Sequence, residues 1–456
     1  MNFKGLKVLV IGTGISGMGA AALLEKNEAI PILFDSNPDI DVEELKKKLP
    51  RDTVTKIYPG ELPANVEKSV DLVVLSPGVP VDIPIVQNFR ERGIKIWGEI
   101  ELGFRFARGQ LLAITGTNGK TTTTALLGQI MKDIAKDPEN VYIVGNIGNP
   151  YTLKAMDTND DSVTVAEISS FQLETALNFK PHVSAILNIT PDHLNRHHTM
   201  ENYIAIKESI AKNQDENDYI ILNYDDPNTR AVADRVKAKV VFFSLKETPD
   251  TIDRKCDLLY MDGENIMYNG QLLLNVNEMQ LIGTHNWENV MAGAGMALSV
   301  GVPIDEVVST IKSFKAVEHR IEFVKTVNGV DYYNDSKGTN PDAAIKAVQA
   351  MKKRTVLIGG GYDKSSKYDE WIESFDGKVK SLILLGQTAG QIADCAKEHG
   401  FNDIIFVNDM AEAVKKAAQI SQPGEAVLLS PACASWGMFK NYEERGRIFK
   451  DLVKEL

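Results

Sequence analysis

Residues 115–122 read Thr-Gly-Thr-Asn-Gly-Lys-Thr-Thr and carry the strongest chemical pattern in the chain. They follow an apolar run, 111–114, that predicts a buried strand, and they precede a stretch that predicts a helix. A glycine-rich turn between strand and helix, ending in Lys-Thr, is typical of a phosphate-binding loop. Its backbone N–H groups favour an anion, Lys120 adds a positive charge, and the Thr121 hydroxyl suits Mg²⁺. The usual loop has a glycine where Ile114 stands, so the sequence predicts a shortened loop that binds ATP or GTP.

A second glycine-rich turn has glycines at positions 12, 14 and 17, between a predicted strand, 7–12, and a predicted helix, 18–26. With Asp35 at the end of the next strand, it matches a dinucleotide-binding fingerprint. Taken alone, this match indicates an NAD-dependent enzyme. The same backbone approach also holds other diphosphates. A second phosphate loop in the chain favours a nucleotide-diphosphate substrate here and ATP at the other loop.

Polar residues follow two more predicted strands: Glu167 directly after the strand 163–166, and His193 shortly after the strand 185–188. Because ligands gather at the carboxyl ends of parallel strands, Glu167 is a candidate Mg²⁺ ligand and His193 a candidate ligand of metal or substrate. The alternative for Glu167 is a charge at the start of a helix. The histidine spacing fits no structural zinc pattern, and His197 and His198 are expected to be exposed. Lys207 lies in a predicted helix, where a lysine is ordinarily solvated.

The last third of the chain has further polar loops after predicted strands. Arg320 and Asp335 could hold the phosphates and the ribose of a nucleotide, and Asp335 belongs to the polar loop 334–341. Lys364 follows three glycines and could bind a carboxylate, and the loop 430–435 is expected at the same sheet edge. The alternative for these loops is a set of ordinary turns.

Alternating strands and helices position all these loops. The pattern predicts an α/β protein of three domains: a Rossmann-like domain over 1–98, a central P-loop domain with a mostly parallel sheet over 99–316, and a Rossmann-like α/β domain over 317–456. Short apolar runs broken by Asp-Gly and Asn-Gly predict hairpins within 240–282.

Composition excludes several classes of protein. The formal net charge is −12, which argues against nucleic acid as the main partner. Three distant cysteines indicate no disulfide framework and are expected to be buried as small apolar residues. No signal peptide or membrane-spanning stretch is predicted, so the expected location is the cytoplasm.

Together these residues resemble the Mur ligase family, the ATP-dependent amide-forming enzymes of peptidoglycan precursor synthesis. The loop 115–121 is similar to a shortened form that this family shares with folylpolyglutamate synthases, which explains Ile114. The resemblance covers all three predicted domains. Other matching stretches are Glu-Ile-Ser-Ser-Phe-Gln-Leu-Glu at 167–174, Asn-Asp-Ser-Lys-Gly-Thr-Asn at 334–340, and 430–435 with 439–442.

The resemblance implies a role for each matching position. Residues implied to bind ATP are Gly116, Thr117, Asn118, Gly119, Lys120, Thr121, Thr122, Asn289, Arg320 and Asp335. Residues implied to bind the UDP-linked substrate are Ser16, Asp35, Ser76, Asn146 and His193. Residues implied to bind D-glutamate are Thr339, Lys364, Ser435 and Tyr442. Residues implied to hold two Mg²⁺ ions are Thr121, Glu167, His193 and Lys207, the last through a carbamate on its amine. Residues implied to act in catalysis are Lys120, His193, Lys207 and Arg320.

The reaction implied is the addition of D-glutamate to UDP-N-acetylmuramoyl-L-alanine through an acyl phosphate, by a monomer without nucleic acid or membrane partners. Two departures from relatives stand out. Ser36-Asn37 follows Asp35 where relatives can have Thr-Arg, which predicts a missing charged contact to the uridine end. The glycine loop before Lys364 also differs in length. The alternatives are a folylpolyglutamate synthase-like ligase and an NAD-binding redox or regulatory protein.

Overall fold

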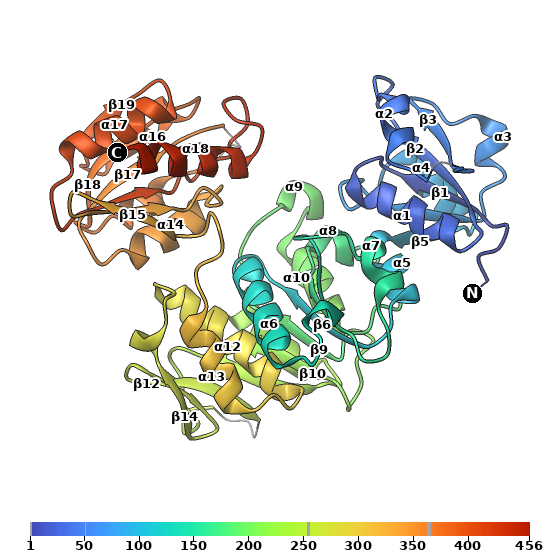
Figure 1. Ribbon diagram of the computed structural model, residues 1–456, viewed down its shortest axis with the longest axis horizontal. Helices are drawn as coiled ribbons and strands as arrows, with labels where there is room; N and C mark the ends of the chain where they lie inside the picture. The colour runs from blue at the N-terminus through green and yellow to red at the C-terminus, as the bar shows by residue number, and fades with distance from the viewer. Residues whose placement is uncertain (1, 51, 253–255, 363–365) are drawn as a thin grey trace. The chain divides into compact units, whose positions relative to one another are not determined.

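The computed structural model describes residues 2–50, 52–252, 256–362 and 366–456, which form three β-sheets with flanking helices (Figure 1). The chain has two compact units: Met1–Val276 with Glu288–Ile311, and Asn277–Trp287 with Lys312–Leu456. The first unit contains two sheets and the second contains one. The α/β class with mostly parallel sheets is confirmed, whereas the predicted boundaries after residues 98 and 316 stay predictions.

The N-terminal sheet has five parallel strands in the order β3-β2-β1-β4-β5. Alternate residues of β1 face opposite layers: Val8 and Val10 pack with helices α1 and α5, and Leu9 and Ile11 pack with α4. This alternation buries both faces, as a parallel sheet requires. The strands are β1 (Lys7–Ile11), β2 (Ile30–Asp35), β3 (Lys56–Pro59), β4 (Leu72–Leu75) and β5 (Lys95–Gly98). The helices are α1 (Ile15–Lys26), α2 (Val42–Lys47), α3 (Ala64–Glu67), α4 (Pro84–Glu91) and α5 (Glu99–Phe106).

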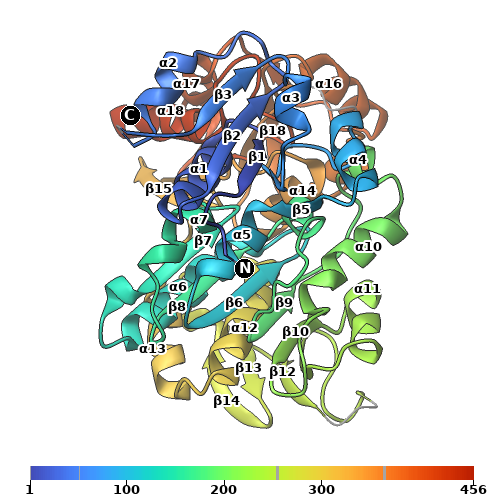
Figure 2. The same ribbon diagram turned by 90° about the vertical axis from the view of Figure 1, so that its right-hand side faces the viewer.

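The middle sheet has nine strands in the order β14-β13-β12-β11-β10-β9-β6-β8-β7. Strands from β7 to β12 are parallel, and β12, β13 and β14 form the antiparallel hairpins predicted within 240–282. Figure 2 shows β6, β9, β10 and β12 side by side. The strands are β6 (Gln110–Thr115), β7 (Val141–Gly145), β8 (Val163–Glu167), β9 (Val183–Ile186), β10 (Tyr219–Asn223), β11 (Lys239–Ser244), β12 (Asp257–Asp262), β13 (Asn265–Tyr268) and β14 (Gln271–Asn275).

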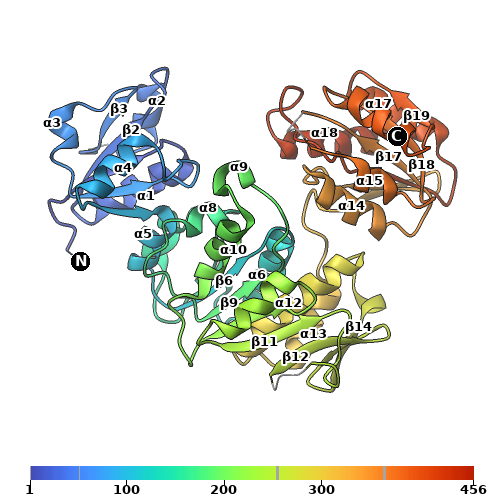
Figure 3. The ribbon, with the colours of Figure 1, turned by 180° about the vertical axis from the view of Figure 1, so that it is seen from behind.

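Helices cover the middle sheet, and α6 lies beside β6 in Figures 1, 2 and 3. Small residues bring α12 close to its neighbours, because Gly293 faces Leu126 of α6 and Gly295 faces β10, β11 and β12. The helices are α6 (Lys120–Ile134), α7 (Tyr151–Lys154), α8 (Ser170–Leu173), α9 (Leu194–His197), α10 (Met200–Glu208), α11 (Pro227–Arg230), α12 (Thr284–Ser299) and α13 (Ile304–Ser313).

Two buried glutamates at the start of α5 fasten this helix to the middle sheet's loops. Glu99 accepts hydrogen bonds from the backbone and the hydroxyl of Thr152, each at 2.7 Å, and burial raises the pKa of Glu99. Glu101 accepts from three successive backbone N–H groups, those of residues 177, 178 and 179. These contacts explain why the first two sheets belong to one compact unit.

The C-terminal sheet has the order β15-β16-β20-β17-β18-β19 and is parallel except for the β15–β16 pair. Helices α14, α15 and α16 pack on one face, and α17 and α18 pack on the other. The strands are β15 (Glu322–Val327), β16 (Val330–Asn334), β17 (Thr355–Gly359), β18 (Val379–Leu384), β19 (Ile404–Phe406) and β20 (Ala426–Leu429). The helices are α14 (Pro341–Ala350), α15 (Asp369–Glu373), α16 (Ala389–Glu398), α17 (Met410–Ile420) and α18 (Tyr442–Glu455).

The burial of the three cysteines matches the prediction only in part. All three are free thiols and Cys433 is buried, but Cys256 and Cys395 are half-buried, so the prediction was wrong for these two. Among the residues that the structure describes, no helix combines the length and hydrophobicity needed to cross a bilayer.

Candidate functional site

The glycine-rich loop between β6 and α6 has the backbone that an anion cradle needs. Gly116 and Gly119 have φ of +150° and +86°, values that disfavour residues with a Cβ. A Cβ on Gly119 would lie 2.2 Å from Oδ1 of Asn289, and one on Gly116 would lie 3.1 Å from Leu187 Cβ. Gly119 is the N-cap of α6 and, as a glycine, contributes no side-chain cap of its own to this helix. The loop therefore fits the phosphates of a nucleotide.

Replacing Gly119 by alanine should weaken nucleotide binding. The left-handed φ and the clash with Asn289 together should cost about 1–3 kcal/mol, or about 10- to 100-fold in affinity. Isothermal titration with ATP measures the change. Gly301→Ala is a matched control, since Gly301 has φ +83° but no atom within 4 Å of an added Cβ. Equal ATP affinities for Gly119→Ala and the wild type would contradict this reading.

Two lysines meet at one carbonyl of this loop. Nζ of Lys120 donates to the carbonyls of Gly116 and Thr117 at 2.8 and 2.9 Å, and Nζ of Lys207 donates to the same Gly116 carbonyl at 2.8 Å. Lys207 is 1% exposed, and burial followed by the charge of Lys120 lowers its pKa well below the ordinary value. The expectation of a solvated lysine is therefore wrong, because α10 turns this side chain toward the loop. A neutral, buried amine is the form that can react with carbon dioxide to give a carbamate.

Glu167 ends β8 beside the loop, because the register pairs it with Ile114 of β6. Its Oε1 accepts a 2.7 Å hydrogen bond from Nδ2 of Asn146, which follows β7. Its Oε2 is buried without a hydrogen-bond partner among the described residues. A buried carboxylate oxygen without a partner is costly unless a cation meets it, so this position fits a Mg²⁺ ligand.

The segment after β9 is fastened to the phosphate loop. β9 ends at Ile186, two residues earlier than predicted, and Asn188 exchanges hydrogen bonds of 2.8 and 3.1 Å with the backbone of Asn118. Thr117 likewise bonds to the N–H and the carbonyl of Thr190. The sequence analysis did not identify Asn188 as a residue that holds the phosphate loop. Its position at the end of an apolar strand could have indicated this role.

His193 lies further along this segment, in the left-handed conformation with φ +53°. Its ring centroid is 4.8 Å from that of Phe171, its Nε2 is 3.5 Å from Asp192 Oδ2, and its side chain is 49% exposed. A half-exposed imidazole remains accessible to a substrate or a metal ion.

His197 contradicts its predicted exposure. It is buried between the rings of Phe171 and Tyr203, and its Nε2 lies 2.9 Å from Ser170 Oγ. Burial lowers its pKa to about 4, so the ring is neutral near pH 7. Its place on a short helix that packs against α10 could not be read from the local sequence. His198 is exposed as predicted.

The N-terminal loop is ordered by the residues predicted to bind the UDP end. Gly12 has φ +98°, and a Cβ on Gly17 would lie 1.8 Å from the Gly12 carbonyl oxygen. Asp35 Oδ2 accepts from the N–H and hydroxyl of Thr13 at 3.1 and 2.9 Å, and Ser76 donates to the Gly12 carbonyl at 3.1 Å. Ser16 is half-buried in the first turn of α1. The structure therefore brings Asp35 and Ser76 to the glycine turn.

In the C-terminal unit, Asp335 lies at the centre of a buried polar cluster. Its Oδ2 accepts from Ser430 Oγ at 2.7 Å and its Oδ1 from the N–H of Ile321 at 3.3 Å. Burial raises the pKa of Asp335 to about 7, against the opposing effects of Ser430, Arg320 and Arg445. At neutral pH this carboxyl is divided between its two protonation states.

This raised pKa predicts a pH-dependent stability. The unfolded carboxyl titrates near its ordinary 3.8 and the folded one near about 7, so folding takes up a proton between these values. The free energy of unfolding should fall as pH rises from about 4 to about 7, by at most on the order of 4 kcal/mol from this group. Urea unfolding of wild type and Asp335→Asn across this range measures the difference. Parallel pH profiles for the two proteins would exclude this contribution.

Arg445, which the sequence did not single out, joins the loops around Asp335. It is buried on α18 and donates to the hydroxyl and carbonyl of Ser336 at 2.9 and 2.7 Å and to the carbonyl of Cys433 at 3.1 Å. Burial lowers its pKa to about 10, so it stays charged at neutral pH. An arginine in a charged helix gave no local sign of burial.

The remaining predicted residues of this unit are distributed around the same loops. Arg320 lines a cavity of about 470 Å³ together with Asn286 and Tyr333. Ser435 is buried, Thr339 is half-buried, and the ring of Tyr442 lies 5.3 Å from Lys337 Nζ. Lys364 lies outside the described residues.

Comparisons with known proteins cover the whole chain. Residues 6–98 match the Mur ligase MurD-like N-terminal domain, 114–297 the Mur ligase middle domain, and 319–433 the Mur ligase glutamate ligase domain. The chain is 53% identical over 460 residues to a UDP-N-acetylmuramoylalanine–D-glutamate ligase of Lachnospira eligens, covering 100% of both chains. It is 52% identical over 458 residues to the enzyme of the same name from Lachnoclostridium phytofermentans, covering 100% of this chain and 99% of the other.

Solved structures with similar folds are more distant in sequence. The UDP-N-acetylmuramate-alanine ligase MurC of Thermotoga maritima superimposes with a TM-score of 0.62 at 20% identity, covering 99% of both chains. The MurF ligase of the same organism, in complex with ADP, superimposes with a TM-score of 0.59 at 18% identity, covering 99% of this chain and 96% of the other. At these identities the likeness supports the fold alone.

Proposed function

The chain belongs to the Mur ligase family, and from this premise we propose that it joins D-glutamate to UDP-N-acetylmuramoyl-L-alanine at the expense of ATP. It is an ATP-dependent ligase of peptidoglycan precursor synthesis. The observation that carries the choice of substrates is the 53% identity over full length with a relative of that name. The glycine cradle with Lys120 supplies the phosphate site that such a ligase needs.

The reaction has two steps. A carboxylate oxygen of the L-alanyl group attacks the γ-phosphorus of ATP, the bond to the β-phosphate oxygen breaks, and ADP leaves. The amine nitrogen of D-glutamate then attacks the carbonyl carbon of the acyl phosphate, loses a proton, and expels inorganic phosphate. No protein nucleophile is needed, so positioning and charge neutralisation provide the catalysis.

For the nucleotide, Lys120 offsets charge on the transferred phosphoryl group, and the backbone of residues 116–119, with Thr121 and Thr122, cradles the phosphates. Asn289 lies beside the loop, because its Oδ1 would be 2.2 Å from a Cβ on Gly119, and from there it contacts the bound nucleotide. Arg320 and Asp335 hold the phosphates and the ribose from the C-terminal unit.

Thr121, Glu167 and His193 would hold two Mg²⁺ ions, and Lys207 would contribute through a carbamate on its amine. Ions bound there would neutralise further charge on the phosphates. Support comes from the orphaned Oε2 of Glu167 and from the buried, depressed-pKa amine of Lys207. Each feature is costly in a folded protein unless a bound group compensates for it.

Each of the two other substrates has its own set of proposed contacts. Ser16, Asp35 and Ser76 bind the UDP end, while Asn146 and His193 contact the muramoyl part. Asn37 replaces the charged residue of some relatives, and its N–H donates to Asp35 Oδ1 at 3.1 Å. Thr339, Lys364, Ser435 and Tyr442 surround D-glutamate.

We further propose that the enzyme works as a monomer in the cytoplasm, where ATP and nucleotide-linked sugars are available. The test of function is phosphate release from ATP with UDP-N-acetylmuramoyl-L-alanine and a panel of amino acids. Release with D-glutamate but not L-glutamate is expected. Release that depends on a folate acceptor, or tight nicotinamide binding without phosphate release, would overturn the proposal.

A further inference from the structure

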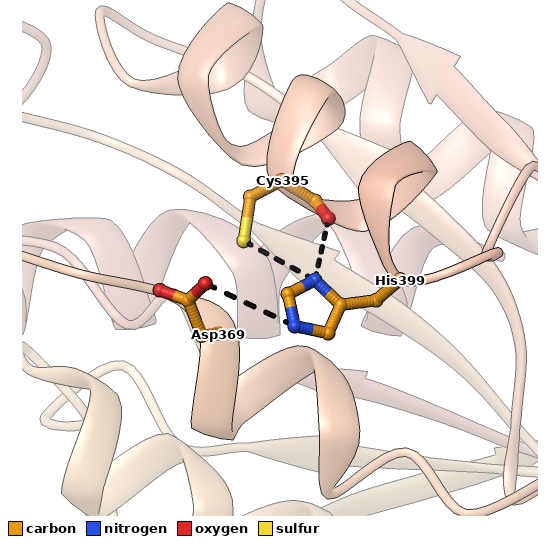
Figure 4. A group of neighbouring side chains, drawn as sticks. All are labelled: Asp369, Cys395 and His399. Carbon is orange, nitrogen blue, oxygen red and sulfur yellow. Dashed lines mark hydrogen bonds and ion pairs between the residues drawn. The ribbon is translucent and has the colours of Figure 1, made fainter.

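A second group of metal-ligand side chains lies on the C-terminal unit, on two neighbouring helices (Figure 4). Asp369 and Glu373 are the first and last residues of α15, and Cys395 and His399 lie at the end of α16. Both pairs are spaced i, i+4, which places the two members on one face of their helix. The two helices pack in the same core cluster, so the pairs face each other.

The ligand atoms are already close together. One atom each of Asp369, Cys395 and His399 lie within 4.8 Å of one another. His399 Nε2 is 3.8 Å from Asp369 Oδ1 and 3.4 Å from Glu373 Oε1, and Cys395 Sγ is 3.9 Å from the other ring nitrogen. Zinc bond lengths of about 2.0–2.3 Å in a tetrahedron require ligand atoms roughly 3.5 Å apart. Side-chain rotation must therefore shorten spacings of up to 4.8 Å by up to about 1.3 Å and turn Cys395 Sγ from the Nδ1 side of the ring toward Nε2.

The histidine is held in the orientation that a metal ligand needs. Its Nδ1 lies 3.0 Å from the carbonyl oxygen of Cys395, and because a carbonyl only accepts, Nδ1 carries the hydrogen. The lone pair of the neutral ring then belongs to Nε2, which faces the two carboxylates. A ring N–H bonded to a backbone carbonyl is the usual support of a metal-bound histidine.

The side chains of Asp369 and Glu373 are 55% and 63% exposed, so a cation can reach their carboxylates from solvent. Within the described part of the chain, His399 is the only basic side chain within 4.0 Å of either carboxylate. The thiol of the half-buried Cys395 lies in the same group, beside the carboxylate of Asp369. A bound divalent ion would hold this sulfur as a ligand thiolate.

We propose that Asp369, Cys395 and His399, with Glu373 as the fourth ligand, form a zinc site that joins α15 to α16. Thiolate and imidazole favour zinc over Mg²⁺ or Ca²⁺, which prefer oxygen ligands. The site uses none of the residues assigned to the ligase reaction, and it stands whether or not the proposed reaction is correct. Its chemistry is structural, since all four positions of the tetrahedron are filled by protein.

The test uses the full-length protein after removal of metals with a chelator, titrated with Zn²⁺ and with Co²⁺ in excess Mg²⁺, which fills oxygen-only sites. One equivalent of Zn²⁺ is expected to bind tightly. Co²⁺ should give a thiolate-to-metal charge-transfer band and the visible bands of a tetrahedral ion. Cys395→Ser and His399→Ala should lose the charge-transfer band or the site, with affinity falling about 100-fold or more, beyond the ~10–100-fold typical of losing a supporting group.

Cys256→Ser is the matched control, because Cys256 is also half-buried but lies in the other compact unit. It should leave both titrations unchanged. Glu373→Gln should weaken binding while retaining the thiolate band. Circular dichroism of each variant separates loss of a ligand from loss of fold. Zinc affinity that is equal in wild type, Cys395→Ser and His399→Ala, or a cobalt spectrum without a thiolate band, would overturn the site and leave an ordinary surface ion pair.

Discussion

Lys120→Ala is expected to lower the rate of the ligase reaction about 10²–10³-fold while leaving the protein folded. Lys120 is the first residue of α6, and its Nζ lies 2.8 Å from the carbonyl oxygen of Gly116. Its positive charge is therefore held at the loop where phosphates bind. Alanine keeps the helix but removes the charge that offsets the phosphoryl group during transfer. Measured phosphate release with saturating ATP, UDP-N-acetylmuramoyl-L-alanine and D-glutamate reports the loss.

The matched control is Lys136→Ala, an exposed lysine two residues beyond α6, which should retain full activity. Near-normal phosphate release by Lys120→Ala would end the assignment of this loop as the ATP site. Release lowered only through a weaker affinity for ATP would show that the charge binds the ground state and transition state equally.

Lys207→Ala is expected to lose about 10²-fold or more in turnover and to regain at least about tenfold with added formate or acetate. The physical reason is that the carbamate proposed for this buried amine supplies negative charge, which a small carboxylate can replace in the space that alanine leaves. Lys120→Ala with the same carboxylates added is the control. Its activity should not be restored, because this variant has lost a positive charge, which a carboxylate cannot replace. Phosphate release over a concentration series of each carboxylate measures the rescue.

A structural readout is independent of activity. Wild-type protein equilibrated with ¹³C-labelled carbon dioxide should show a carbamate carbonyl resonance that is absent from Lys207→Ala. Full activity of the alanine variant without additives would contradict the proposal. So would equal rescue of Lys120→Ala.

Much of the fold was predictable because apolar runs and glycine turns are local features. The strands β1 and β6 were predicted to within one residue of each end, and the phosphate loop was recognised from its spacing alone. The end of β9 was misplaced because the buried apolar residues Leu187 and Ile189 continue beyond the end of the ladder. There the chain turns to bond with the phosphate loop, a contact that spans about 70 positions.

The residues that were misjudged share one property: their environment is made by distant segments. His197 looked like one of several exposed histidines, yet the rings of Phe171 and Tyr203 enclose it. Arg445 reads as a surface residue in a helix with many charges, yet loops from 336 and 433 surround its guanidinium. Burial of a long charged side chain depends on what packs over it, which local sequence does not contain.

The shared Gly116 carbonyl has a consequence for the order in which ligands are loaded. Burial, followed by the positive charge of Lys120, lowers the pKa of the Lys207 amine and so favours its neutral form, which is the form that is nucleophilic toward carbon dioxide. Bound phosphates would offset that charge and favour the protonated, unreactive amine. Because coupling between two sites is reciprocal, the empty phosphate loop is the state that accepts carbon dioxide, so this enzyme is expected to be primed before its nucleotide arrives.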